Sequence, residues 1–270
     1  MSRELPLGQH TTYTEAYDSA LLHPIARAES RVRLGLQRET PFFGEDIWNA
    51  WDLTWLAPNG QPRVAAAEMR VPASSVNIIE SKSLKLYLNS LSMTRFDNKA
   101  AVRRRICDDV SAVLKADVTV RLDDASSPSR DLRDFPGHRL DELEVECTAY
   151  SVDAALLSAS GRSVVDETLV THSFRSLCPV TAQPDLGSVA IRYSGVSIDH
   201  AGMLRYLVSF RQHNDFHEAC VERMFTDIQK RCRPTALAVY ARFQRRGGID
   251  INPFRSTANE SADNLRLWRQ

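Results

Sequence analysis

The chain has 270 residues, 43% of them hydrophobic and 25% charged, which is the composition of a globular protein and not of a disordered one. Its 34 lysines and arginines balance 34 aspartates and glutamates, so there is no net charge and no global basic field to attract nucleic acid. We therefore expect a small-molecule substrate and no direct contact with nucleic acid.

The N-terminus and the cysteines indicate the compartment. The opening M-S-R-E-L-P-L-G-Q-H lacks the basic start and apolar centre of a signal peptide, and no apolar run is long enough to span a bilayer. The five cysteines are odd in number and include no C-x-x-C pair, which favours reduced thiols over a disulfide framework. These features predict a cytoplasmic protein with no membrane contact.

The first half reads as an N-terminal arm, residues 1–40, followed by a regular order of elements. The arm is polar and irregular in its pattern. Alternating and three-to-four apolar spacings then predict strands at 46–56, 63–71 and 117–122 and helices at 81–92 and 98–115. The pair Asn59-Gly60 is typical of a hairpin turn and joins the first two strands.

The second half repeats this order. Its expected strands are 166–177, 188–193 and 236–243, and its expected helices are 199–212 and 215–232. The segment L-Y-L-N-S-L at 86–91 resembles R-Y-L-V-S-F at 205–210. The same offset aligns Val102, Arg104 and Asp108 with Val221, Arg223 and Asp227. This echo predicts a duplication of one fold within the chain.

The predicted fold class is α+β, with two tandem units that each place two helices on an antiparallel sheet. We expect the first domain at 41–140 and the second at 141–270, joined near the D-F-P-G-H segment at 134–138.

Cys178 and Asp185 lie on a turn-rich segment, C-P-V-T-A-Q-P-D. A thiolate is a strong nucleophile, and a partly desolvated aspartate can donate a proton to the product of its attack. Taken alone, the stretch fits a buried structural thiol beside a turn aspartate better, because cysteine is often buried for packing.

The segment I-I-E-S-K-S-L-K-L-Y at 78–87 places a carboxylate, a hydroxyl and two lysines where a strand meets a helix. Free backbone N–H groups at a helix start suit a phosphate or a substrate oxygen. The simpler interpretation is a helix cap made by Glu80 and Ser81, with Lys82 and Lys85 in water.

Two further clusters are weaker. His213 and His217 have the i, i+4 spacing of metal ligands, but no third ligand is evident, so we expect no zinc site. In R-R-G-G-I-D-I-N-P-F-R at 245–255, a Gly-Gly pair beside arginines could hold a phosphate, although R-G-G also occurs in ordinary hairpins.

Together these four clusters resemble one family, the long, two-domain form of the NADPH-dependent 7-cyano-7-deazaguanine reductases, which are the nitrile reductases of queuosine (tRNA modification) biosynthesis. The resemblance runs from about residue 13 to residue 270. It rests on four segments, which are E-S-K-S-L-K-L-Y at 80–87, C-P-V-T-A-Q-P-D at 178–185, L-R-Y-L-V-S-F-R at 204–211 and R-R-G-G-I-D-I-N-P at 245–253. It implies two tunnelling-fold units, each with a four-stranded antiparallel sheet backed by two helices, and no metal.

The resemblance also implies a chemistry. Cys178 would attack the nitrile carbon and form a covalent thioimide, Asp185 would donate the proton, and His217 would relay protons beside the substrate. Two NADPH molecules per turnover, used as co-substrates, would then give the primary amine 7-aminomethyl-7-deazaguanine. The binding residues carried over are Ile79, Glu80, Ser81, His217 and Glu218 for the deazapurine, and Ser81, Lys82, Arg246 and Gly247 for NADPH.

An alternative function is a non-reducing tunnelling-fold protein, either a pterin- or purine-processing enzyme or a ligand-binding module. Loss of NADPH absorbance in the presence of the nitrile would separate the two. We expect a homodimer, because tunnelling-fold units usually close by association.

Overall fold

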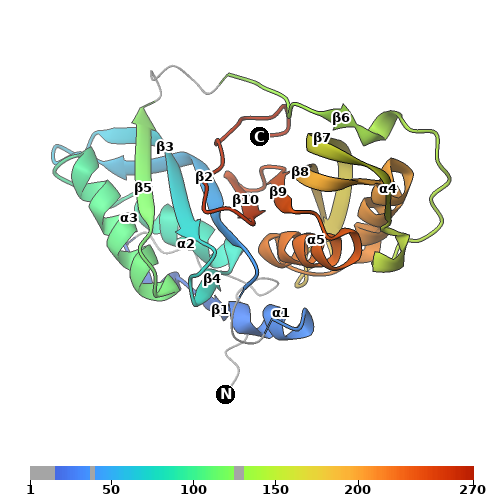
Figure 1. Ribbon diagram of the computed structural model, residues 1–270. Helices are drawn as coiled ribbons and strands as arrows, with labels where there is room; N and C mark the ends of the chain where they lie inside the picture. The colour runs from blue at the N-terminus through green and yellow to red at the C-terminus, as the bar shows by residue number, and fades with distance from the viewer. Residues whose placement is uncertain (1–15, 37–39, 125–130) are drawn as a thin grey trace. The chain divides into compact units, whose positions relative to one another are not determined.

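The computed structural model describes residues 16–36, 40–124 and 131–270, and for residues 161–165 it describes the backbone only. The chain forms two compact units (Figure 1). The first unit comprises Met1–Ser30, Ile47–Arg130 and Arg245–Asp250, and the second comprises Arg31–Asp46, Asp131–Gln244 and Ile251–Gln270. The units interleave along the chain, unlike the consecutive ranges 41–140 and 141–270 expected from the sequence.

The first part of the chain carries the elements η1 Ser19–Leu21, β1 Pro24–Ala26, α1 Arg27–Arg33, β2 Phe43–Leu56, β3 Pro62–Pro72, β4 Asn77–Ile79, α2 Ser81–Ser90, α3 Lys99–Leu114 and β5 Thr119–Asp124. Strands of the first unit run in the order β5-β3-β2, and β1 pairs with β4 in a separate small sheet. The expectation of an irregular arm was therefore wrong for residues 16–36, which contain η1, β1 and α1.

The core of the first unit follows the sequence pattern. Alternate residues of β3, namely Ala65, Ala67 and Met69, are buried, and so is the apolar stripe of α3. Gly60 has a φ of +84°, which fits the predicted hairpin turn between β2 and β3. Removing such stripes from water contributes about 1.5–3 kcal/mol for each large side chain, which is what holds the helices on the sheet.

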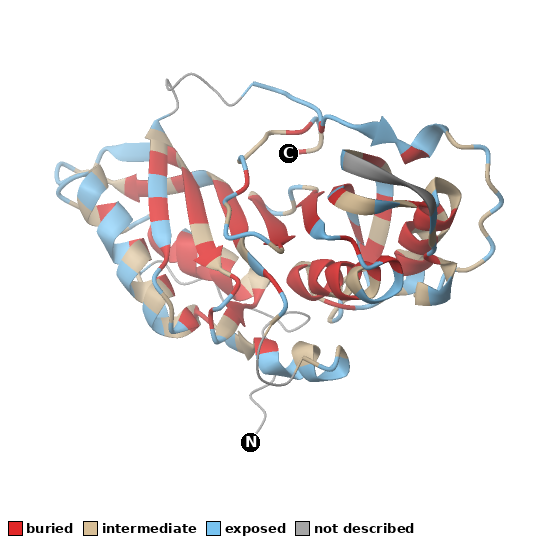
Figure 2. Ribbon diagram, in the orientation of Figure 1, coloured by how far each residue is buried: buried red, intermediate tan, exposed pale blue. Residues whose placement is uncertain are grey.

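The second part of the chain carries β6 His138–Arg139, η2 Leu140–Glu142, η3 Ala154–Leu156, β7 Ala159–Leu177, β8 Pro184–Ile198, α4 His200–Ser209, η4 Phe210–Gln212, α5 His217–Cys232, β9 Ala236–Phe243 and β10 Ile249–Ser256. The strand order is β10-β9-β8-β7-β6. The first three pairings are antiparallel and β6 pairs with β7 in parallel. Both α4 and α5 carry many buried residues (Figure 2).

The α+β class is confirmed, but the strands do not divide into two four-stranded antiparallel sheets. Within the described residues, the first unit has the strand order β5-β3-β2 and the second has β9-β8-β7-β6, with a parallel pair at its edge. Strand β10 is divided, with Ile249 and Asp250 in the first unit and its remaining residues in the second. Strand β10 was missed, because Pro253 interrupts a pattern in which Asp250 and Asn252 alternate with isoleucines. The four alternating residues, Ile249, Asp250, Ile251 and Asn252, are all buried.

Matching hydrogen bonds in the two units support the duplication. In the first unit the Tyr87 hydroxyl donates to Asp109 Oδ2 at 2.7 Å, and in the second the Tyr206 hydroxyl donates to Asp227 Oδ2 at 2.8 Å. The aspartate that matches Asp227 is therefore Asp109, and the alignment of Asp108 with Asp227 was wrong by one residue.

A serine at the end of the first helix makes the same pair of contacts in both units. Ser90 Oγ donates to the carbonyl of Tyr87 and accepts from the N–H of Asp18, and Ser209 Oγ does the same with Tyr206 and Asp153. The two aspartates open η1 and η3, in the segments D-S-A-L and D-A-A-L. The repeat thus includes part of the predicted arm.

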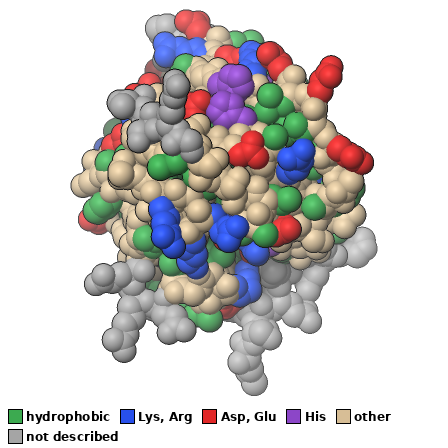
Figure 3. Space-filling model, turned by 45° about the vertical axis from the view of Figure 1, so that its right-hand side comes forward, with side chains coloured by type: hydrophobic (Ala, Val, Ile, Leu, Met, Phe, Trp, Pro, Cys, Tyr) green, Lys and Arg blue, Asp and Glu red, His purple; other side chains and the backbone are tan. Residues whose placement is uncertain are grey.

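Side chains of both signs of charge are present on the face seen in Figure 3. Within the described residues, no helix has the length and apolar content that crossing a membrane requires.

Candidate functional site

The loop between β7 and β8 holds the predicted nucleophile. Cys178 follows the last residue of β7, its N–H donates to the Gln183 carbonyl at 2.9 Å, and its carbonyl accepts from the Ala182 N–H at 2.9 Å. Ala182 has a φ of +54°, so the loop turns sharply there. The thiol is half-buried, and the backbone on both sides of it is hydrogen-bonded.

The end of β7 also pairs with the segment that leads into α5. The Leu177 N–H donates to the His213 carbonyl at 2.8 Å, and the Leu177 carbonyl accepts from the Asp215 N–H at 3.2 Å. Because His217 and Glu218 are the first residues of α5, this pairing ties the cysteine loop to the start of that helix.

Asp185 and His217 meet in the second unit. Asp185 lies in β8, opposite Ser176 of β7, and is only 5% exposed. The His217 Nε2 atom lies 3.3 Å from Asp185 Oδ2. A buried carboxylate beside an imidazole can hold or pass on a proton, which is the role that proton transfer to a substrate requires. Glu218, the next residue of α5, is 4% exposed.

Phe243, which the sequence analysis placed only in a strand, contacts this pair. Its ring stacks on the His217 ring with 3.7 Å between centroids and 1° between planes. The signal for it was an aromatic residue at the end of a predicted strand, which does not by itself indicate a site.

Two other cysteines, Cys220 and Cys232, are buried. Burial raises the pKa of the Cys220 thiol, with nearby Asp215 acting in the same direction, and burial raises the pKa of Cys232 to about 11. Both thiols are therefore protonated and unreactive near neutral pH. Cys107 and Cys147 are half-buried, and their thiols lie near backbone carbonyls.

No metal centre is formed by the described residues, among which no group of three or more His, Cys, Asp and Glu side chains could hold an ion. His213 and His217 approach different carboxylates, since His213 Nε2 lies 3.8 Å from Asp215 Oδ2. Burial lowers the pKa of His213, so this imidazole is held mostly neutral at pH 7.

In the first unit, Glu80 is the N-cap of α2. Its Oε1 accepts from the Lys82 N–H at 2.9 Å and its Oε2 accepts from the Ser83 N–H at 2.8 Å. The helix-cap interpretation is therefore confirmed for Glu80, whose carboxylate occupies both of these N–H groups. Each carboxylate oxygen still has a second lone pair for a ligand donor.

The junction before α2 is rigid. Ile79 pairs with Pro24 in the β1–β4 ladder, and the Glu80 N–H donates to the His23 carbonyl at 3.0 Å. Ser83 Oγ accepts from the His23 N–H. The predicted substrate residues Ile79, Glu80 and Ser81 are therefore held together as one backbone unit.

The Gly247-Gly248 pair forms the turn of a hairpin. The φ values are +59° and +81°, and Arg246 and Ile249 exchange backbone hydrogen bonds across it. Two successive residues with positive φ are typical of a type I′ turn, so the turn alone explains the glycines. Of the two interpretations of this segment, a phosphate site or an ordinary hairpin, the hairpin is present.

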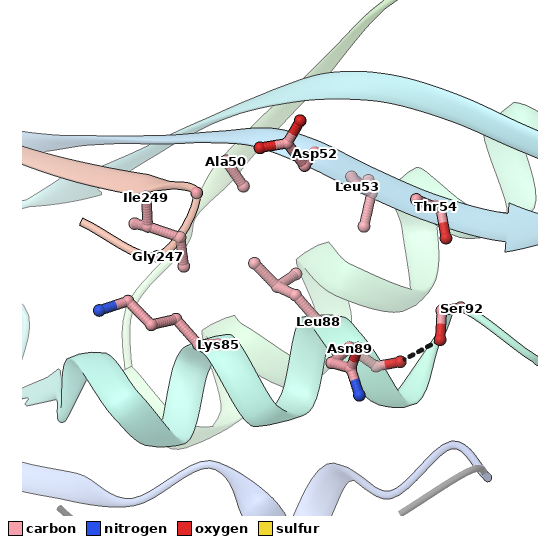
Figure 4. Close-up of a pocket in the computed structure, with 11 residues that line it drawn as sticks. Ala50, Asp52, Leu53, Thr54, Lys85, Leu88, Asn89, Ser92, Gly247 and Ile249 are labelled. Atoms are coloured by element: carbon pink, nitrogen blue, oxygen red, sulfur yellow. Dashed lines mark hydrogen bonds between the residues drawn. The ribbon is translucent and has the colours of Figure 1, made fainter. Parts of the chain in front are cut away.

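A pocket of about 170 Å³ opens beside this turn (Figure 4). Lys85 of α2 and Asp52 of β2 line it, and a Cβ on Gly247 would lie 3.3 Å from the Lys85 side chain. The helix-cap interpretation put Lys85 in water, but its side chain lies next to the predicted cofactor segment.

The fold and these residues define an α+β protein with a cysteine, a carboxylate and an imidazole gathered around one hairpin. Residues 13–122 match a family model described as "Nitrile reductase, 7-cyano-7-deazaguanine-reductase N-term", and residues 184–262 match one described as "QueF-like protein".

Relatives that align over nearly the whole chain are named for the same reductase as the first family model. Proteins from Burkholderia pseudomallei (strain K96243) and Paraburkholderia xenovorans (strain LB400) are 52% and 51% identical to this chain. Both alignments cover 98% of this chain and 98% of the relative, and both relatives bear the name "NADPH-dependent 7-cyano-7-deazaguanine reductase". The chain belongs to the NADPH-dependent 7-cyano-7-deazaguanine reductase family, which confirms the resemblance seen in its motifs.

Proposed function

We propose that this protein reduces the nitrile 7-cyano-7-deazaguanine to 7-aminomethyl-7-deazaguanine with NADPH, in queuosine biosynthesis. The observation that carries the proposal is the identity of about half of all residues, over nearly the whole chain, to proteins named for this activity. The cysteine, carboxylate and imidazole of the second unit supply the groups that such chemistry needs.

Cys178 is the nucleophile of the proposed reaction. Its thiolate adds to the nitrile carbon, one C–N π bond breaks, and the nitrogen takes a proton from Asp185, which leaves a thioimide. NADPH supplies the two hydrides. Between the two reductions the C–S bond breaks, and Cys178 leaves as a thiolate. A serine would leave less readily, which is why a thiol suits this position.

His217 supports the proton transfers. Asp185 has given one proton to the nitrile nitrogen, and the Nε2 of a protonated His217, 3.3 Å from the carboxylate, is placed to return one. The burial of Asp185 excludes competing water from this exchange.

The residues of the first unit fit part of a dinucleotide. Lys82, Lys85 and Arg246 supply positive charge for phosphate, and the Gly247 turn leaves an open pocket beside Lys85. Ser81 and Lys82, at the first turn of α2, and Arg246 with Gly247 remain the proposed NADPH contacts.

The finer fold and the assembly belong to the same proposal. The strand–strand–helix–helix–strand order and the matched hydrogen bonds of both units support two tandem tunnelling-fold units. We propose a cytoplasmic homodimer, and sedimentation or light scattering will measure its mass.

The stoichiometry of the reaction tests the proposed function. Reducing a nitrile to a primary amine takes two hydrides and two protons, so each nitrile consumed is expected to oxidise two NADPH. Absorbance at the NADPH band, with product counted by mass spectrometry, gives the ratio. Absence of NADPH oxidation, or accumulation of an imine after one NADPH, would contradict the proposal.

Glu80 and Glu218 are expected to accept hydrogen bonds from the deazapurine ring. Glu80→Gln and Glu218→Gln should each weaken nitrile binding by about 1.5–3 kcal/mol, the worth of a hydrogen bond to a charged group. Isothermal titration calorimetry without NADPH measures the effect.

Asp199→Asn is the matched control for Glu80→Gln. Asp199 caps α4 in the second unit as Glu80 caps α2, accepting from the N–H groups of Ala201 and Gly202. Its replacement perturbs a helix cap without touching a proposed ring contact. Equal losses of affinity in Glu80→Gln and Asp199→Asn would assign the effect to capping and exclude recognition by Glu80.

A further inference from the structure

The stacked rings of His217 and Phe243 have a further consequence, which rests on the proposed function. We infer that Phe243 is a positioning residue of the reductase. Its ring fixes the plane of the His217 imidazole so that Nε2 faces Asp185. Phe243 itself is fully buried and takes no part in bond making.

The imidazole has few other restraints. Its Nδ1 is buried and has no hydrogen-bond partner within the described part of the chain. The outer torsion of a histidine side chain is soft and roughly two-fold, so a ring held at one nitrogen alone could rotate or flip. Within the described part of the chain, the Phe243 stack and the Asp185 contact restrain its orientation.

Phe243 is itself held on both sides of its backbone. Its N–H donates to Asn252 Oδ1 at 3.1 Å, and its carbonyl accepts from Gln270 Nε2 at 3.0 Å. Gln270 Nε2 also donates to Asn252 Oδ1, which closes a small buried network. These side chains keep the end of β9 from shifting along the sheet.

The neighbouring strand leaves room for the Phe243 ring. Gly187, two residues after Asp185 in β8, is the register partner of Phe243. A Cβ there would lie 3.3 Å from Phe243 Cδ1, which is tighter than ordinary contact. The ring is therefore confined from the sheet side while its face meets His217.

Stacking also suits the charge that His217 must carry. The face of an aromatic ring is negative and attracts a cation. In the proposed reaction, Nε2 returns a proton to Asp185 while the Phe243 ring face lies against the imidazole. A leucine would fill space but would offer no such face.

Phe243→Leu tests the inference, with Phe174→Leu as the matched control in the same core. Phe174 is buried, and its ring packs against those of Phe210 and Phe243. We expect kcat to fall about tenfold in Phe243→Leu, below the ~10²–10⁴-fold that complete loss of acid–base catalysis costs. Phe174→Leu should lower thermal stability similarly and leave kcat near the wild-type value.

Two further readouts separate positioning from general damage. In His217→Gln, adding Phe243→Leu should lower kcat no further, because Phe243 acts through the imidazole. In NMR of ring-labelled histidine, the His217 protons should show a ring-current shift that Phe243→Leu removes and Phe174→Leu retains. Phe243→Met replaces Phe243→Leu if the latter does not fold.

Equal kcat values in Phe243→Leu and Phe174→Leu, or additive losses in the double variant, would overturn the inference. A missing ring-current shift in the wild-type protein would also overturn it. The NMR measurement needs no turnover. A wild-type protein that shows the shift but oxidises no NADPH would therefore contradict the proposed function and leave the stack itself established.

Discussion

Mixing the protein with 7-cyano-7-deazaguanine in the absence of NADPH is expected to add one whole substrate mass to the chain, at Cys178. Addition of a thiolate to a C≡N bond expels no group, so no mass is lost. The thiol is half-buried at the end of β7, on a loop whose backbone is hydrogen-bonded on both sides. Intact-mass spectrometry followed by peptide mapping makes the measurement.

Variants give the prediction its controls. Cys178→Ala should form no adduct and lose turnover by about 10⁴-fold or more, as removal of a nucleophile does in other enzymes. Asp185→Asn should bind the nitrile but form the adduct slowly. Cys147→Ala removes another half-buried thiol and should behave as wild type. Nitrile reduction by Cys178→Ala at a rate near that of wild type would show that the thiol has only a structural role.

Replacing Arg255 by methionine is expected to cost the second unit about 3–5 kcal/mol of unfolding free energy, the usual effect of breaking a buried ion pair. The Arg255 guanidinium is fully buried, with Asp46 Oδ1 at 2.8 Å and Glu222 Oε1 at 2.9 Å. Methionine would leave both carboxylates without this partner. Urea unfolding, followed by circular dichroism at constant pH, measures the loss as a lower midpoint.

Arg192→Met is the matched control, since the same substitution breaks an exposed pair in the same unit. Arg192 contacts both carboxylate oxygens of Glu260 at 2.7 and 2.8 Å, but its side chain is 48% exposed. Exposed pairs contribute at most about 1 kcal/mol. A loss in Arg255→Met no larger than that in Arg192→Met would show that the buried network adds little to stability.

Periodicity predicted most of the fold. Strand β9 was predicted with its observed limits, and α3 and α5 to within two residues, because each carries a continuous apolar stripe. The three-residue strands β1 and β4 were beyond prediction, since a period cannot be read from so few residues. Strand β10 was not predicted, because its polar residues are buried by hydrogen bonds to other side chains. Asp250, for example, accepts from Asn49 and Trp51.

The site was predicted from its motifs only as separate segments. Spacing along the chain brings Cys178 and Asp185 to one hairpin. It carries no information on Phe243, which lies at the end of β9 and stacks on His217 at the start of α5. Spacing also could not decide whether the N–H groups at the start of α2 are capped by Glu80 or free to bind a phosphate, because the same residues fit both roles. Hydrogen-bond geometry decided that question.

The matching tyrosine–aspartate and serine hydrogen bonds of the two units also bear on ancestry. They survive where they fix how helices pack. The loop 57–61 between β2 and β3, which has the place of the Cys178 loop between β7 and β8, contains no cysteine. In an assembly of identical single-unit subunits, any mutation changes every subunit at once. Fusing two copies into one gene removes that constraint, so one half could lose a nucleophile, or never acquire one, while inheritance of the shared scaffold continued.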